Sequence, residues 1–168
     1  LITGVWDFTA EGKKFQIFYQ ANKDAHFVGA TQVMDAFKDS TLVSTFKTLT
    51  GGDPKPFDVD DSECNPDQAY RMFIVEGESM GDAAHATWEL TGTGRTYIDF
   101  RVEQLGNCWG TSFVRDTRYC ATEDQEQVNG NVAHEYFHAG ESAAFSLPKQ
   151  LYGVDPCADC LADWASDR

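Results

Sequence analysis

The sequence lacks any uninterrupted run of about eighteen apolar residues, so it predicts no membrane-spanning helix. It is also poor in positive charge, because 13 Lys and Arg stand against 27 Asp and Glu and give a formal net charge of −14. A chain of this charge repels nucleic-acid phosphates and anionic membrane surfaces, and we expect neither as a partner. Position 1 is not a Met, which suggests a processed or trimmed start.

Two further sequence patterns are missing. There is no glycine-rich phosphate loop, so nucleotide binding is not indicated, and there is no internal repeat. The chain has 168 residues, 42% of them hydrophobic and 13% aromatic, which is enough to bury one sizeable core. We therefore expect a single domain that spans residues 1–168.

Five cysteines are many for a cytosolic domain of this size, and they favour a secreted, extracellular protein. They are Cys64, Cys108, Cys120, Cys157 and Cys160, and they lack the two C-x-x-C pairs of a zinc ribbon. Four of the five can form two disulfides, and one is left as a free thiol or an intermolecular partner. The spacing alone leaves the connectivity open, and it also leaves the oligomeric state open.

Alternating apolar and polar residues, interrupted by turn residues, recur along most of the chain and predict seven to nine short strands. The segments are 6–10 with 15–19 as a first hairpin, two or three strands between 27 and 46, and then 70–75, 86–90, 95–103 and 108–115. Only residues 157–166 have helical spacing. Hence we expect a mostly β protein, an antiparallel up-and-down β-barrel with a C-terminal helix; a β-sandwich is the second choice.

The segment His134-Glu135-Tyr136-Phe137-His138 has the H-E-x-x-H pattern of zinc metalloproteases. On a helix the two histidines would share a face and bind one Zn²⁺, with Glu135 as the base and Glu141, Asp155 or Asp159 as a third ligand. On a strand, His134 and His138 would stand about 13 Å apart and could not share a metal. Asn129-Gly130 and Gly140 favour the strand, and we accordingly expect no metal or other cofactor; a zinc metalloprotease is the alternative.

The opening of the chain resembles the lipocalins. Gly4-Val5-Trp6 is similar to their G-x-W motif, and the stretches 5–8, 14–19 and 26–29 resemble the arthropod salivary amine-binding lipocalins found in ticks. This resemblance implies a secreted barrel that holds a small molecule, either a biogenic amine such as histamine or serotonin, or a lipid. It also suggests that Cys64 pairs with Cys157 or Cys160, beside a Cys108–Cys120 bridge.

A protonated amine in such a barrel would need an acidic partner and aromatic rings. The candidates are the aromatics Trp88, Phe100 and Tyr97 and the acids Asp99 and Glu89, which come from neighbouring strand segments. Strand alternation also permits a plainer interpretation, in which the two acids face solvent and Trp88 and Phe100 belong to the core. The ligand itself is not specified by the sequence, and a surface for a protein partner is a further possibility.

Overall fold

A computed structural model describes residues 2–38, 41–56, 68–76, 84–88, 95–102 and 125–145. These residues form six strands and three helices in the order β1 (Thr3–Ala10), β2 (Lys13–Gln20), α1 (Asp24–Lys38), α2 (Leu42–Thr50), β3 (Lys55–Pro56), β4 (Tyr70–Val75), β5 (Ala84–Trp88), β6 (Arg95–Arg101) and α3 (Gln125–Phe145). Within this part of the chain, about half of the residues are helical. No helix in these ranges is long and apolar enough to cross a membrane.

The strands form one mixed sheet in the order β1-β2-β4-β6, with β5 on the far side of β6 and the short β3 beside the start of β6. The β1–β2 and β5–β6 pairs are antiparallel, whereas β2–β4, β4–β6 and β3–β6 are parallel. The sheet is open, and β1 and β5 each pair with a single neighbour among the described strands. The expected antiparallel up-and-down barrel is therefore wrong, because parallel neighbours require crossover connections rather than a meander of hairpins.

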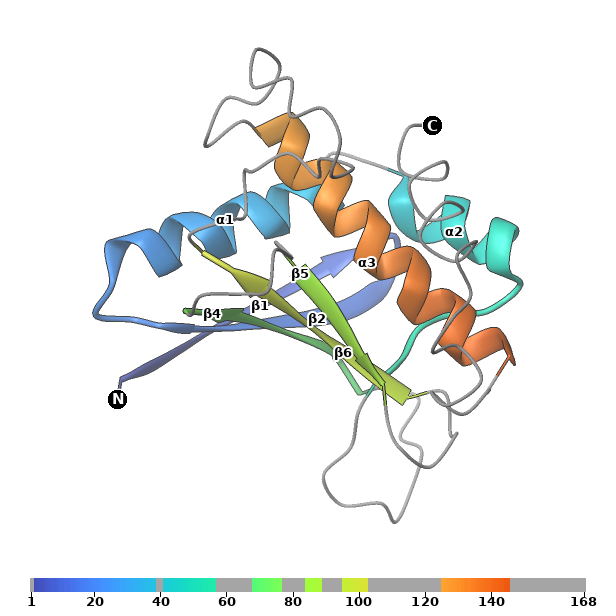
Figure 1. The fold of residues 1–168 in the computed structure, drawn as a ribbon, viewed down its shortest axis with the longest axis horizontal. Coiled ribbons are helices and arrows are strands. Elements are labelled where there is room, and N and C mark those ends of the chain that lie inside the picture. The colour runs from blue at the N-terminus through green and yellow to red at the C-terminus, as the bar shows by residue number, and fades with distance from the viewer. Residues whose placement is uncertain are drawn as a thin grey trace, which may run out of the picture.

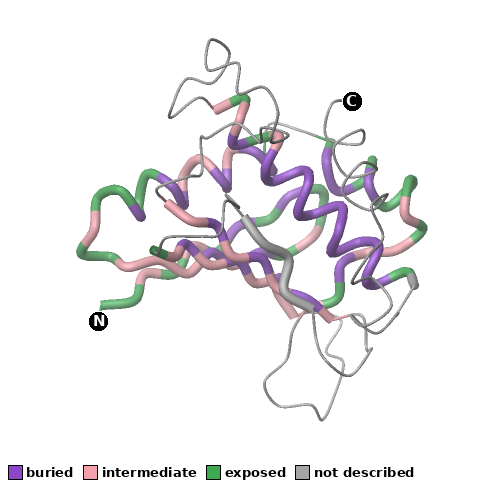
Figure 2. The backbone as a smooth tube through the Cα atoms, viewed as in Figure 1, coloured by how far each residue is buried: buried purple, intermediate pink, exposed green. Residues whose placement is uncertain are grey.

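All three helices cover one face of the sheet, and α3 runs across it beside β5 and β6 (Figure 1). The core lies between the two layers and contains Phe8, Phe15, Ile17, Met72, Ile98 and Phe100 from the sheet, and Val33, Phe37, Phe46, Val132 and Tyr136 from the helices. Helix α3 is buried along most of its length (Figure 2). Helix α3 is therefore stabilised mainly by its packing against the sheet and less by the helix propensity of its residues.

The strand predictions were accurate where alternation was clear. The first hairpin is β1 and β2, joined by Glu11-Gly12 with both residues at positive φ, 48° and 81°, as a two-residue hairpin turn requires. The apolar segment 70–75 is β4, and the segment 95–103 contains β6. The segment 86–90 overlaps β5 only at residues 86–88, and β5 pairs with β6 in antiparallel orientation. In β6 the burial alternates along the strand, with Ile98 and Phe100 buried beneath the helices.

The strands expected between residues 27 and 46 are wrong, since this region forms α1 and α2. In α1 the buried residues Ala30, Val33, Met34 and Phe37 recur three and four apart, which is the spacing of one helical face. The segments 108–115 and 157–166 and all five cysteines lie outside the described residues.

The N-terminus of α2 receives its cap from another element. Thr41 makes no side-chain capping bond, and instead the Glu11 carboxylate, from the β1–β2 turn, accepts hydrogen bonds from the backbone N–H of Ser44 (3.1 Å) and from its hydroxyl. Burial by itself would raise the pKa of Glu11, but the bonds from Ser44 and Val43 outweigh it and lower the pKa below its usual range. A negative charge at this position also complements the helix dipole.

Replacing Glu11 with Gln is expected to lower the free energy of unfolding by about 0.5–1 kcal/mol at pH 7, since the exposed cap loses its charge but keeps its shape. Because the folded-state pKa of Glu11 is lowered, this contribution is complete above its ordinary pKa of about 4.3 and disappears as the pH falls through the folded-state value. Urea unfolding of both proteins at pH 7 and pH 3 measures the difference. A difference that stays the same at pH 3 would contradict the charged cap.

Candidate functional site

Helix α3 carries the H-E-x-x-H segment in its middle, so the strand interpretation of residues 134–138 is wrong. The Asn129-Gly130 pair that suggested a hairpin lies inside the first turns of the helix. Burial explains the outcome, because Val128, Val132 and Tyr136 recur four residues apart and face the core. Each glycine costs about 1 kcal/mol relative to Ala in a helix, which the burial of such a face outweighs.

Gly140 has a packing role rather than a role in a turn. A Cβ at this position would stand 3.0 Å from the Thr50 hydroxyl oxygen at the end of α2. In the same contact region, a Cβ on Gly52 would lie 3.1 Å from the backbone nitrogen of Ala144. These glycines allow α3 to approach the end of α2 closely, which is a common use of the residue.

His134 and His138 lie one turn apart on α3, and both are buried. Their Nε2 atoms are 3.1 Å apart, and the ring centroids are separated by 4.7 Å. Two nitrogens that each stand 2.0–2.1 Å from one tetrahedral zinc ion are about 3.3 Å apart. The pair is therefore close to the geometry of a shared zinc ion, and the spacing argument against a metal, which assumed a strand, no longer holds.

Glu135 is buried next to this pair, in the same turn of α3. Its negative charge acts on Tyr70 of β4, whose hydroxyl forms a 2.7 Å hydrogen bond with the buried Thr96 hydroxyl. Burial raises the pKa of Tyr70, the bond with Thr96 opposes this rise, and the nearby negative charge of Glu135 adds to it. Glu135 thus provides a buried carboxylate in the same turn of α3 as the histidine pair, where electrostatic effects are strong.

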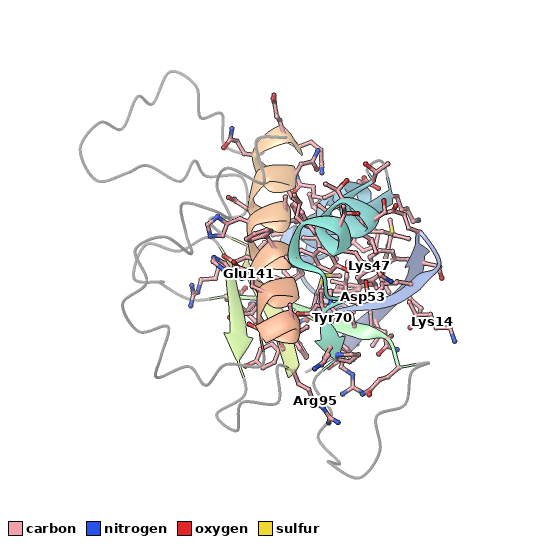
Figure 3. The ribbon with its side chains drawn as sticks, turned by 90° about the vertical axis from the view of Figure 1, so that its right-hand side faces the viewer. Lys14, Lys47, Asp53, Tyr70, Arg95 and Glu141 are labelled. Atoms are coloured by element: carbon pink, nitrogen blue, oxygen red, sulfur yellow. The ribbon has the colours of Figure 1, made fainter. Side chains whose placement is uncertain are left out.

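Glu141 follows on the same stripe of the helix, three residues after His138. Its Oε2 atom lies 3.4 Å from Nδ1 of His138, the ring nitrogen that does not face His134. Figure 3 shows Glu141 on the opposite side of α3 from Lys47 and Asp53, so Glu141 lies away from the packing contact between α3 and α2.

A third metal ligand is not found among the described residues, where no group of three His, Cys, Asp or Glu side chains could hold an ion. Of the three candidates from the sequence, Glu141 approaches the wrong nitrogen of His138, and Asp155 and Asp159 lie outside the described residues. The described chain therefore provides two converging histidines and a neighbouring carboxylate, which is part of the ligand set that a catalytic zinc ion uses.

The structure describes the side chains of three of the residues predicted for an amine site, Phe100, Tyr97 and Asp99. Phe100 is fully buried in the core, in agreement with the plainer interpretation, whereas Tyr97 and Asp99 are half-buried on the other face of β6. Trp88 ends β5, where its backbone pairs with Thr96, and Glu89 lies outside the described residues. Without a closed barrel there is no barrel interior for these side chains to line, and the binding of an amine or a lipid stays a prediction.

One surface depression of about 470 Å³ is formed near the β1–β2 hairpin, with Lys14, Gln16, Asp7 and Gln68 among its lining residues. Gln16 donates a 2.8 Å hydrogen bond to Asp7 within it. No residue of α3 lines this depression, so it is separate from the histidine pair. We assign it no function.

Comparisons with models of protein families, with curated proteins and with solved structures found no match for this chain. The lipocalin resemblance gains no support from them, and the up-and-down barrel it implied is absent from the described fold. The geometry of α3 and its neighbours defines a candidate metal site on a central helix that packs against β5 and β6 of the mixed sheet.

Proposed function

We propose that this protein is a zinc-dependent hydrolase that cleaves peptide bonds. The observation that carries the proposal is the 3.1 Å separation of the Nε2 atoms of His134 and His138 on α3. A pair of buried imidazoles at this separation is suited to hold one ion, and Glu135 provides a carboxylate in the same turn. A catalytic zinc ion also requires a third protein ligand, and the described residues provide none.

A bound zinc ion would polarise the carbonyl of the scissile bond and bring the pKa of its water toward 7. Glu135 then accepts one proton from the attacking water at its carboxylate and delivers it to the departing amine nitrogen. The products are a carboxylic acid and an amine, and the water supplies the oxygen and the protons. His134 and His138 keep their positions because α3 is buried along this stretch.

The sheet offers support for a peptide as the substrate. Helix α3 packs against β5, and no described strand pairs with the other edge of β5. An exposed edge presents a row of backbone N–H and C=O groups to which an extended peptide can add as a further strand. A substrate held in this way would lie next to the helix that carries the histidine pair.

Elemental analysis tests the metal directly. Protein purified without a chelator or an affinity tag is expected to contain one zinc per chain, and replacing His134 and His138 with Ala should remove it, because each imidazole supplies one of the protein ligands. A matched control is His26→Ala, which removes a buried histidine of α1 rather than of α3. Circular dichroism shows whether each variant is folded. Zinc-free wild-type protein, or zinc retained by the double variant, would contradict the proposal.

A further inference from the structure

Glu141 of α3 is an acidic residue with a buried side chain. Only 9% of the residue is exposed, and its Oε2 atom is buried and makes no hydrogen bond within the described part of the chain. Burying an ionised carboxylate is costly unless a donor or an opposite charge accompanies it. Its near neighbour is Nδ1 of His138, at 3.4 Å, one helical turn earlier.

The two ring nitrogens of His138 have different neighbours. Nε2 lies 3.1 Å from the Nε2 atom of His134, and Nδ1 lies 3.4 Å from Oε2 of Glu141, a contact that is not a hydrogen bond in this structure. A neutral imidazole carries its proton on only one of these nitrogens, and a carboxylate accepts but cannot donate. The Glu141 carboxylate therefore favours the form of His138 that is protonated on Nδ1, which leaves a lone pair on Nε2.

That form is the one needed to bind a metal ion beside His134. Metal-binding histidines generally donate their other N–H to a carboxylate or a carbonyl, which fixes the orientation of the ring and makes it a stronger ligand. The carboxylate in such an arrangement lies on the far side of the ring from the ion. Glu141 has this placement, which distinguishes it from the third ligand that its spacing in the sequence allowed.

We propose that Glu141 is a positioning residue for His138: its carboxylate accepts the Nδ1–H of His138 and holds the ring with the Nε2 lone pair directed toward His134 and the ion. The proposal rests on the zinc-dependent function proposed above. It adds that the metal site of this chain includes an acidic residue three positions after the second histidine, and that this residue acts through His138 without touching the ion.

Zinc affinity provides the first test, measured by competition with a chromophoric chelator. Glu141→Gln keeps the size of the side chain and removes its charge, and it is expected to weaken zinc binding 10- to 100-fold. Glu126→Gln is the matched control, because Glu126 is an exposed residue in the first turn of the same helix. The zinc affinity of this variant is expected to stay within twofold of that of the wild type. Equal affinities of wild type and Glu141→Gln would overturn the proposal.

The protonation site of His138 provides a second test that needs no metal. In the metal-free wild-type protein, nitrogen NMR of the histidine rings is expected to show His138 mainly protonated on Nδ1, and in Glu141→Gln this preference should disappear. A wild-type ring protonated on Nε2 would overturn the proposal even if the Gln variant does not fold. Wild-type protein that binds no zinc would instead defeat the proposed hydrolase, a separate result from either of these.

Discussion

Replacing Glu135 with Gln is expected to reduce the kcat/KM for peptide hydrolysis by about 10²- to 10⁴-fold, the range that a general base contributes. Gln cannot accept the proton of the attacking water, whereas it fills the same buried space in α3 as Glu. The zinc content is expected to stay at one ion per chain, because the ion is held by His134 and His138. Rates on a mixture of fluorogenic peptides, with elemental analysis of the same samples, measure both quantities.

The control for this experiment is Glu126→Gln, an identical change at an exposed position of the same helix. It should leave the peptidase rate within about twofold of the wild type, since surface substitutions away from a site have small effects. If Glu135→Gln retains wild-type activity with its zinc in place, Glu135 is not the base. If it loses zinc as well as activity, Glu135 contributes to holding the site rather than to proton transfer.

Replacing Phe15 with Ala is expected to lower the free energy of unfolding by about 3–5 kcal/mol, the cost of removing a large aromatic side chain from a core. Phe15 is 1% exposed, and its ring packs against Phe8 and Phe37 at centroid distances of 5.1 and 4.7 Å. It also contacts Tyr136 of α3 at 6.1 Å, so the resulting cavity would lie directly beneath the helix that carries the histidines. A typical domain has a total stability of only about 5–15 kcal/mol.

Phe27→Ala provides the comparison, because the same side chain on α1 is 47% exposed and packs edge-on against Trp6 at 5.2 Å. Its loss should cost about 1–1.5 kcal/mol, since roughly half of the transfer energy is at stake and no closed cavity forms. Urea unfolding measures both free-energy losses, provided that the m-value, the slope of the unfolding free energy against urea concentration, is the same in each variant as in the wild type. Similar losses for the two variants would mean that the interface between the sheet and α3 is not the main core.

Some elements of this fold can be predicted from local sequence, because they depend only on residues that are close together along the chain. The Glu11-Gly12 turn and the alternation on either side of it predicted the β1–β2 hairpin, and alternation predicted β4 and β6, because a strand places successive side chains on opposite faces. The helical spacing of Val33, Met34 and Phe37 is present in the sequence too, although strands were predicted for this region. The chemical identity of the H-E-x-x-H segment was also fully contained in the sequence.

The tertiary structure decided which of the two interpretations of that segment holds. Asn129-Gly130 is a strong local turn signal, yet the burial of Val132 and Tyr136 against the sheet outweighs it and makes residues 125–145 one helix. The parallel pairing of β2 with β4 and of β4 with β6 was equally out of reach, because it joins segments separated by long crossovers. Local periodicity follows from the sterics of neighbouring residues, whereas strand order and helix placement follow from which distant surfaces are buried together.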